Sequence, residues 1–303
     1  MELVTLFYII DEFCKGYERK WQKLLKANLL SSGKPTHSHA SRLKMAEILT
    51  IAVNFHLSGY RMFKWYYTKE VLGKTYTHSC FPKAVSYNQF LELIRANLIP
   101  LVHLLIFLMN GSEKTGTYFI DSTSLVVCSN HRTSQHKTFK GIATMGKTSE
   151  GWFFGFKLHI VTNDKGELMA AKVTTGNVAD SNMEVVGMLA RNLEGKLFAD
   201  RGYVSGKLFD LLWEKGLKLV TDIKKNMKNK LMPLIDKLLL RKRFIIETIN
   251  DHLKNNEQIE HSRHRSLSGF MTNLISGLIA YQVQPKKPSL HLREKLGIER
   301  VVY

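Results

Sequence analysis

Two aspartates lie where a carboxylate is unfavourable unless it is paired or binds a metal. Asp121 interrupts the apolar run from Phe119 to Thr123. Removing a charge from water at such a position costs free energy that an ion pair or a metal ion can offset. Asp200 directly follows the apolar run Leu197–Ala199, and ligands of open α/β sheets collect at the carboxyl ends of strands. Taken alone, each aspartate is equally compatible with a hydrogen-bonded turn or a helix cap.

A third acidic residue lies between two cations on one face of a predicted helix. At about 100° per residue, Arg243, Glu247 and Lys254 fall on one narrow face, separate from the apolar stripe of this helix. An exposed Arg–Glu pair four residues apart would explain the first spacing and contributes only about 0.2–0.5 kcal/mol. A carboxylate on a cationic helix that faces phosphate explains both flanking cations. The apolar stripe consists of Ile235, Leu238, Leu239, Ile245, Ile246, Ile249 and Leu253.

Three carboxylates without His or Cys ligands favour hard, oxygen-preferring cations, that is Mg²⁺ or Mn²⁺. Two such ions about 3.5–4 Å apart can activate the attacking oxygen and stabilise the leaving oxygen of a phosphodiester displacement. Water as the attacking group gives hydrolysis and a free 3′-OH. That 3′-OH as the attacking group gives strand transfer by the same chemistry, so no covalent protein nucleophile is needed.

The first part of the chain has the apolar periodicity of helices. A turn at Ser58-Gly59-Tyr60 between two of these helices suits a helix-turn-helix DNA reader, although any small helical bundle has the same pattern. The basic stretch Lys15–Lys44 favours the DNA reader. Ser41 and Ser86 are candidate helix caps. The predicted helices cover residues 5–25, 43–57, 60–71 and 86 to about 109.

Beyond residue 112 the pattern changes to strands, followed by alternating helices and short apolar strands. This order predicts an α/β fold with a mixed five-stranded sheet and flanking helices, a ribonuclease-H-like catalytic core preceded by an all-α N-terminal domain. We therefore predict a helical domain over 1–112, a catalytic domain over 113–283 and a basic tail over 284–303. Predicted strands cover 118–127, 152–162, 168–175, 196–199 and 217–220, and predicted helices cover 182–193, 205–215 and about 233–255.

The charge of the chain indicates a polyanionic partner. Lys plus Arg number 44 against 26 Asp plus Glu, which gives a net charge of +18. Such a bias suits nucleic acid or an anionic membrane surface, although a generally basic protein would share it. The most apolar run, Leu98–Met109, contains Pro100 and is too short to span a bilayer, so we expect nucleic acid and no membrane. Three cysteines that are far apart in sequence, with no secretory signal in view, indicate the cytoplasm.

The three acidic segments together resemble the signatures of DDE insertion-sequence transposases, and the bacterial family numbered nine-eight-two is the most similar. The resemblance runs from Thr5 to Pro288. It is carried by Phe119-Ile120-Asp121-Ser122-Thr123, by Phe198-Ala199-Asp200-Arg201-Gly202-Tyr203, and by Arg243-x3-Glu247-x6-Lys254. Further matching stretches are Ser134–Lys137 with Lys140-Gly141, Gly151–His159, Thr175–Val178, Leu238–Arg243, His261–Arg265 and Pro285–Pro288.

This resemblance implies a function for the chain and roles for its residues. It implies that Asp121, Asp200 and Glu247 bind two Mg²⁺ or Mn²⁺ ions, and that Arg243 and Lys254 are the flanking cations of the related Tyr-Arg-Glu-Lys signature. Leu240 stands where that signature has Tyr, so no role is carried over there. The enzyme would bind terminal inverted repeats, cut the element ends and transfer the 3′-OH strands into target DNA, as a homo-oligomer on double-stranded DNA in the bacterial cytoplasm at the nucleoid. Candidate phosphate contacts are Lys137, Lys140, Lys224, Lys225, Lys228, Arg241, Lys242, Arg263 and Arg265.

Two alternatives have the same fold. The first is a ribonuclease-H-like DNA nuclease that cuts without joining, and the second is an inactive DNA-binding descendant. A complete acidic triad with flanking cations argues against the descendant. A basic helical N-terminal domain favours the transposase over a bare nuclease, because recognition of element ends needs a reader.

Overall fold

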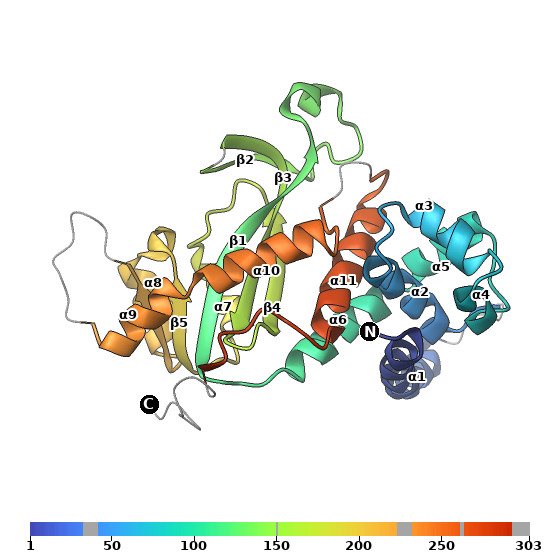
Figure 1. The fold of residues 1–303 in the computed structure, drawn as a ribbon, viewed down its shortest axis with the longest axis horizontal. Helices are drawn as coiled ribbons and strands as arrows, with labels where there is room; N and C mark the ends of the chain where they lie inside the picture. Colours follow the sequence, from blue (N-terminus) through green and yellow to red (C-terminus); the bar gives the residue numbers. More distant parts are fainter. Residues whose placement is uncertain (33–41, 150, 223–231, 261–263, 293–303) are drawn as a thin grey trace. The chain divides into compact units, whose positions relative to one another are not determined.

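The computed structural model describes residues 1–32, 42–149, 151–222, 232–260 and 264–292 (Figure 1). The chain forms two compact units. The first contains Met1–Leu108, Asn256–Gln258 and Ser268–Pro285, and the second contains Met109–Asn255, Ile259–Leu267 and Lys286–Tyr303. The helix near the end of the chain thus groups with the N-terminal helices. The domain limits predicted above remain predictions.

The described part of the first unit is helical. Its second helix ends at Leu57, and Ser58 and Gly59 form the predicted turn, where Gly59 has a φ of +76° that favours glycine. The next helix is short and continues as a single π-helical turn, Tyr67–Val71. The helices are α1 (Leu3–Ser32), α2 (Met45–Leu57), α3 (Phe63–Tyr66), α4 (Tyr76–Cys80), α5 (Tyr87–Ala96), α6 (Leu98–Asn110) and α11 (Leu267–Val283).

Proline divides the segment that periodicity predicts as one helix from Ser86 to about Met109. Ser86 caps α5 as expected, because its side chain accepts a hydrogen bond from the N–H of Gln89. The prediction of a continuous helix is wrong, however, since α5 and α6 are bent by 60° around Asn97. Pro100 has no N–H to donate to the carbonyl of Ala96, and its ring clashes with that carbonyl, so it is tolerated only in the first turn of a new helix. Ser41, the other predicted cap, lies outside the described residues.

No helix among the described residues is both long and apolar enough to cross a membrane by itself. The bent pair α5 and α6 reaches the required length and composition only when both helices are taken together.

A buried histidine gives the first unit a pH-dependent stability. His56 is 4% exposed, and its Nδ1 lies 2.5 Å from the carbonyl oxygen of Glu257. Burial lowers the pKa of His56 from 6.5 to about 4, although the Glu257 contact acts in the opposite direction. The unfolded chain therefore binds the extra proton between these two pH values. We expect the free energy of unfolding to fall as the pH drops from 6.5 towards 4.

Urea denaturation at several pH values, with wild type compared with His56→Gln, tests this expectation. The variant is needed because Glu257 has the opposite dependence. Burial raises the pKa of Glu257 to about 7, so its contribution to stability falls as the pH rises from about 4.5 to 7. The difference between wild type and variant should shrink as the pH falls below 6.5. A constant difference would contradict a neutral buried imidazole.

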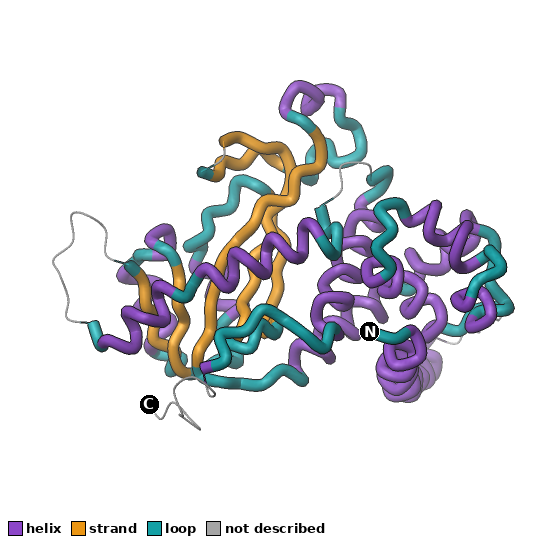
Figure 2. Tube along the Cα trace, in the orientation of Figure 1, coloured by secondary structure: helices purple, strands orange, loops and turns teal. Residues whose placement is uncertain are grey.

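The second unit is built on a mixed six-stranded sheet, whose strands are drawn in orange in Figure 2. β1 pairs with β3 in antiparallel fashion and with β5 in parallel, and β5 pairs in parallel with β6. β3 pairs through its first residues with β2 and through its later residues with β4. The strands are β1 (Thr117–Cys128), β2 (Thr144–Thr148), β3 (Gly151–Asn163), β4 (Leu168–Thr175), β5 (Gly195–Ala199) and β6 (Leu217–Thr221).

The predicted mixed sheet is present, but the count of five strands is wrong because β2 was missed. The segment Thr144–Thr148 is partly exposed and lacks the apolar alternation that identifies strands. It becomes a strand only by pairing with Gly151–Gly155 of β3. The sequence of the segment itself does not predict this contact.

Helices cover this sheet and leave one end of β1 accessible to polar groups. α7 (Met183–Leu189) and α8 (Gly206–Trp213) bury their apolar side chains against Tyr118 and Ile120 of β1. Alternation along the strand turns Phe119 and Asp121 to the opposite face. There α10 (Phe244–Asn255) crosses β1, and α9 (Leu234–Arg241) packs beside β5 (Figure 1).

The single helix predicted over 233–255 is two helices, α9 and α10. Around Lys242 the hydrogen bonds tighten: the N–H of Arg243 bonds to the carbonyl of Leu240, and that of Ile245 bonds to Lys242. α9 packs on β5 and β6, whereas α10 packs on β1. Neighbouring strands are rotated by the sheet twist, so two shorter helices follow the sheet where one straight helix would leave it. The break also exposes Leu238 at 46%, although the apolar stripe predicted it to be buried.

Candidate active site

The register of the parallel strands brings Asp121 and Asp200 to the same end of the sheet. β1 and β5 pair from Thr117–Lys196 to Phe119–Phe198. Asp121 follows Phe119 by two residues and Asp200 follows Phe198 by two, so the two carboxylates lie at equivalent points on neighbouring strands. β5 ends at Ala199, which leaves the edge of β1 unpaired beside Asp121. The prediction that Asp200 marks a strand end is therefore confirmed.

Asp121 is partly buried, and it interacts electrostatically with both other predicted acidic residues. Burial, to which the nearby charges of Asp200 and Glu247 add, raises the pKa of Asp121 to about 7. A hydrogen bond from the Ser122 backbone and the charge of Arg243 act in the opposite direction. The charges of Asp200, Glu247 and Arg243 thus all act on Asp121. Together with burial, their net effect disfavours the ionised form of Asp121.

Asp200 is held in place by the turn that follows β5. Its Oδ1 accepts a hydrogen bond of 2.7 Å from the N–H of Gly202, and this bond begins a single 3-10 turn, Arg201–Tyr203. A Cβ added to Gly202 would lie 2.9 Å from the same Oδ1. A larger residue at position 202 would displace this carboxylate oxygen, so Gly202 permits the close approach and the turn holds the oxygen in place.

Glu247 reaches the site from the first turn of α10. Its Oε1 accepts a 2.7 Å hydrogen bond from Nη2 of Arg243, and its side chain is 55% exposed. The break between α9 and α10 places Arg243 just before α10. The pair matches the predicted spacing, and an exposed ion pair of this kind adds little to stability.

Lys254 makes its contacts beyond the position of Asp121 along β1. Its Nζ contacts Oε2 of Glu260 at 3.0 Å and Oγ of Ser124 at 3.4 Å, the latter on β1. Glu260 also accepts the backbone N–H of Val126. Lys254 lies seven residues after Glu247 on the same helix, α10, and so about two turns further along the same side of it. Lys254 therefore lies further along β1 than Asp121.

Sequence reasoning missed Asn250, which supports the site. Its Nδ2 donates a 3.1 Å hydrogen bond to Oδ2 of Asp121. Asn250 is 7% exposed, and its own Oδ1 is buried without a partner among the described residues. It lies three residues after Glu247, on the same side of α10, and this spacing is the signal that could have identified it.

A second network adjoins the site on the other face of β1. Oδ1 of Asp180 accepts hydrogen bonds from Oγ of Ser122 at 2.6 Å and from Nζ of Lys157 at 2.8 Å. Asp180 does not cap the following helix, because Asn182 caps α7 by accepting a hydrogen bond from the N–H of Val185. Asp180 instead neutralises Lys157, which is 6% exposed in the middle of β3.

The chemistry of the acidic residues fits divalent cations. Asp121, Asp200 and Glu247 offer only oxygen donors, which Mg²⁺ and Mn²⁺ prefer. Burial and the neighbouring negative charges disfavour ionised Asp121, and a cation would reverse both effects. In the part of the chain that the structure describes, no three His, Cys, Asp or Glu side chains are close enough together to hold an ion. Glu247 is paired with Arg243 instead.

The candidate phosphate contacts that can be described are all exposed. Lys137 and Lys140 lie between β1 and β2, and Arg241 and Lys242 lie at the junction of α9 and α10, next to Arg243. Arg265 is also exposed. Lys224, Lys225, Lys228 and Arg263 lie outside the described residues.

Comparison with known proteins identifies the family of the segment that carries these residues. The family model for the transposase DDE domain matches residues 111–267, more than half of the chain. A search of curated proteins found no match. A cryo-EM structure of the piggyBac transposase synaptic complex with hairpin DNA is similar at a TM-score of 0.41 and 10% identity, over 98% of this chain and 84% of that chain. This similarity is too low to assign a fold. The matched family segment contains Asp121, Asp200 and Glu247, and the chain belongs to the family of transposases with a DDE domain.

Proposed function

We propose that the chain is the transposase of an insertion sequence, of the bacterial family numbered nine-eight-two. It binds the terminal inverted repeats, cuts phosphodiester bonds at the element ends and transfers the 3′-OH strands into target DNA. One observation carries the proposal: Asp121, Asp200, Glu247 and Arg243, from three separate segments, interact electrostatically around Asp121 of β1. The mixed sheet with helices on both faces supports a ribonuclease-H-like core.

In this proposal Asp121, Asp200 and Glu247 are the ligands of two Mg²⁺ or Mn²⁺ ions. When bound, such ions activate the attacking oxygen and stabilise the leaving oxygen of the displacement. Asn250 orients Asp121, and the Gly202 turn orients Asp200. Arg243 releases Glu247 on cation binding and then contacts the DNA phosphate, because a guanidinium binds phosphate oxygens well.

The proposed DNA surfaces come from both units. Residues 1–112 read the element ends, and this is supported by the α2–α3 turn. Beyond that turn, Trp65 is 56% exposed and Nζ of Lys69 lies 5.0 Å from its ring centre. The exposed lysines and arginines of the second unit contact phosphates. Two ends must be held together for transposition, so the active form is a homo-oligomer on double-stranded DNA.

Cleavage and joining of labelled element-end DNA by the wild-type protein, with Mg²⁺ or Mn²⁺, tests this function. A transposase yields both cut ends and products joined to a target duplex. Cutting without joining would instead identify a nuclease with the same fold. Binding without cutting in either metal would identify an inactive DNA-binding descendant, and either result would overturn the proposal.

The affinity for DNA should depend steeply on salt. Each phosphate that the protein neutralises contributes about −0.9 to the slope of log affinity against log salt. Replacing one phosphate-contacting lysine, as in Lys140→Ala, should reduce the steepness of this slope by about 1. Filter binding or fluorescence anisotropy over a salt series measures the slope. Lys114→Ala removes an exposed lysine that is not among the predicted contacts and is the matched control. Equal slopes for Lys140→Ala and wild type would remove Lys140 from the DNA surface.

A further inference from the structure

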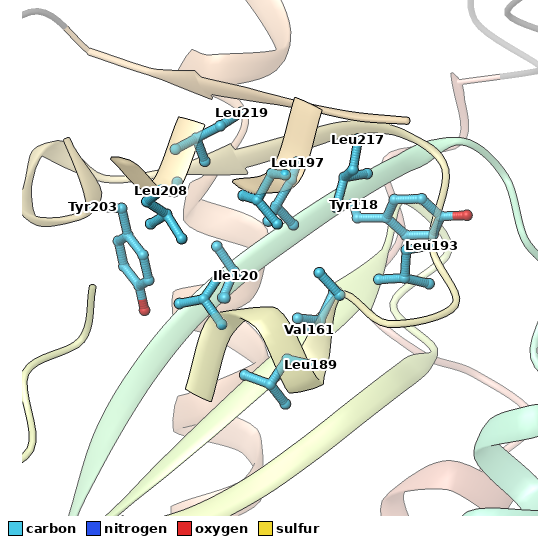
Figure 3. Packing of buried hydrophobic residues seen from close by; sticks show 14 of the residues in the cluster. Tyr118, Ile120, Val161, Leu189, Leu193, Leu197, Tyr203, Leu208, Leu217 and Leu219 are labelled. Atoms are coloured by element: carbon cyan, nitrogen blue, oxygen red, sulfur yellow. The ribbon is translucent and has the colours of Figure 1, made fainter. Parts of the chain in front are cut away.

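Tyr203 has a fully buried ring, and its hydroxyl lies at the edge of the hydrophobic cluster. The residue is 1% exposed and packs with Ile120, Leu208 and other members of the cluster between the sheet and α7 and α8. Figure 3 shows its hydroxyl pointing away from Leu208. The sequence places Tyr203 three residues after Asp200, at the end of the turn that fixes this carboxylate.

The hydroxyl of Tyr203 is buried and has no hydrogen-bond partner among the described residues. It lies among negative charges: after burial, the charges of Asp121, Asp180 and Asp200 raise the pKa of Tyr203 well above its ordinary value, and Arg243 acts in the opposite direction. The phenol therefore keeps its proton and is a hydrogen-bond donor. Among the described residues it donates this proton to none of the three carboxylates.

A second unsatisfied atom lies beside the same carboxylate. Asn250 donates to Asp121 through Nδ2, but its Oδ1 is buried without a partner. The segments that carry Asp121, Asp200 and Glu247 thus include an unused donor on Tyr203, three residues after Asp200, and an unused acceptor on Asn250, the hydrogen-bond partner of Asp121. Buried polar atoms without partners are rare and need an explanation. Water, which both accepts and donates hydrogen bonds, can satisfy either atom.

Divalent cations bring such water with them, because Mg²⁺ gives up its hydration shell reluctantly and usually keeps several water molecules. We propose that Tyr203 is a positioning residue of the cation site: its hydroxyl donates a hydrogen bond to a water molecule of the hydration shell when Asp121 and Asp200 hold a divalent cation. This inference rests on the proposed function, and it gives Tyr203 a task in addition to packing.

The proposal predicts opposite effects of Tyr203→Phe with and without the cation. Without the cation the substitution removes an unsatisfied buried hydroxyl, so the urea midpoint in EDTA should stay the same or rise. With the cation it removes a support of the hydration shell, so the dissociation constant for Mn²⁺ should increase about tenfold, the size of effect that outer-shell partners of metals have. Electron paramagnetic resonance of free Mn²⁺, with the full chain and no DNA, measures this affinity independently of catalysis.

Tyr118→Phe is the matched control, since it also removes a tyrosine hydroxyl from the same buried cluster. Tyr118 is 1% exposed, and its hydroxyl accepts a hydrogen bond from the N–H of Gly116 at 3.3 Å. Loss of this satisfied hydroxyl should lower the urea midpoint in EDTA and leave the Mn²⁺ affinity unchanged.

The outcomes separate this inference from the proposed function. A weaker Mn²⁺ affinity in Tyr203→Phe, but not in Tyr118→Phe, supports the positioning role. An unchanged affinity, or an equal loss in both variants, overturns it. Asp121→Asn tests the cation site itself. If wild type and Asp121→Asn bind Mn²⁺ equally, or if neither binds it, the metal site of the proposed function is wrong, independently of the result for Tyr203.

Discussion

Glu247→Gln is expected to abolish DNA cleavage and joining by the purified protein while DNA binding is retained. The amide keeps the size of the side chain but removes the negative charge that would hold a divalent cation. Stabilisation of transition-state charge by a bound metal is worth several kcal/mol, so we expect cleavage to slow by about a thousandfold or more. Folding should be little affected, because the side chain is more than half exposed and its pair with Arg243 is of the surface kind.

Single-turnover cleavage of labelled end DNA, with binding measured in parallel, checks this result. Asp251→Asn is the matched control, because it removes one exposed negative charge from the same helix, one turn beyond Glu247. Oδ1 of Asp251 accepts a hydrogen bond from Nδ2 of Asn255 on the same helix, so the substitution should leave the rate nearly unchanged. Full activity in Glu247→Gln would show that Glu247 is an ordinary surface residue and that the third acid lies elsewhere.

Asp236→Asn is expected to destabilise the second unit by about 3 kcal/mol, the largest stability effect that we predict. Oδ1 of Asp236 accepts a hydrogen bond of 2.7 Å from Nζ of Lys196, which joins α9 to β5. The side chains are only 1% and 15% exposed. Removing the carboxylate charge leaves the Lys196 ammonium in a poorly solvated place without the anion that compensates it.

Urea denaturation followed by tryptophan fluorescence measures the loss. The double variant Lys196→Met/Asp236→Leu should recover much of it, since apolar residues of similar volume often replace a buried ion pair at little cost. Glu113→Gln disrupts the pair of Glu113 and Lys165, whose side chains are 40% and 37% exposed. This exposed pair should contribute no more than about 1 kcal/mol. Similar losses in both single variants would show that burial does not set the strength of the Lys196 pair.

The sequence predicts the central strands of the second unit because their apolar pattern is local. β1, β3, β5 and β6 are all found within a few residues of their predicted bounds. β2 is not predicted from the sequence because its formation depends on pairing with β3. The two predicted long helices fail for different reasons. Pro100 breaks the first, which the sequence alone could have indicated. Packing against a twisted sheet breaks the second, and no local pattern reveals it.

The candidate site shows the same division between local and long-range information. Asp121 and Asp200 are identified because charges next to apolar strands are costly, and Glu247 is identified by its flanking cations. The supporting residues depend on contacts between distant segments. Asn250 lies 129 positions from its partner Asp121, and Asp180 lies 58 positions from Ser122. Periodicity within one element cannot predict such contacts, and the same holds for the contact of Lys254 with Ser124, which lies 130 positions away.

Iron-mediated cleavage of the polypeptide tests most directly whether the three carboxylates form one cation site. Fe²⁺ bound in place of Mg²⁺ generates hydroxyl radicals in the presence of ascorbate and peroxide, and these radicals cut the main chain beside the ion. The account predicts cuts near Asp121, Asp200 and Glu247 together, which excess Mg²⁺ suppresses and Asp121→Asn abolishes. Cuts confined to one of these segments, or unaffected by Asp121→Asn, would contradict a shared site.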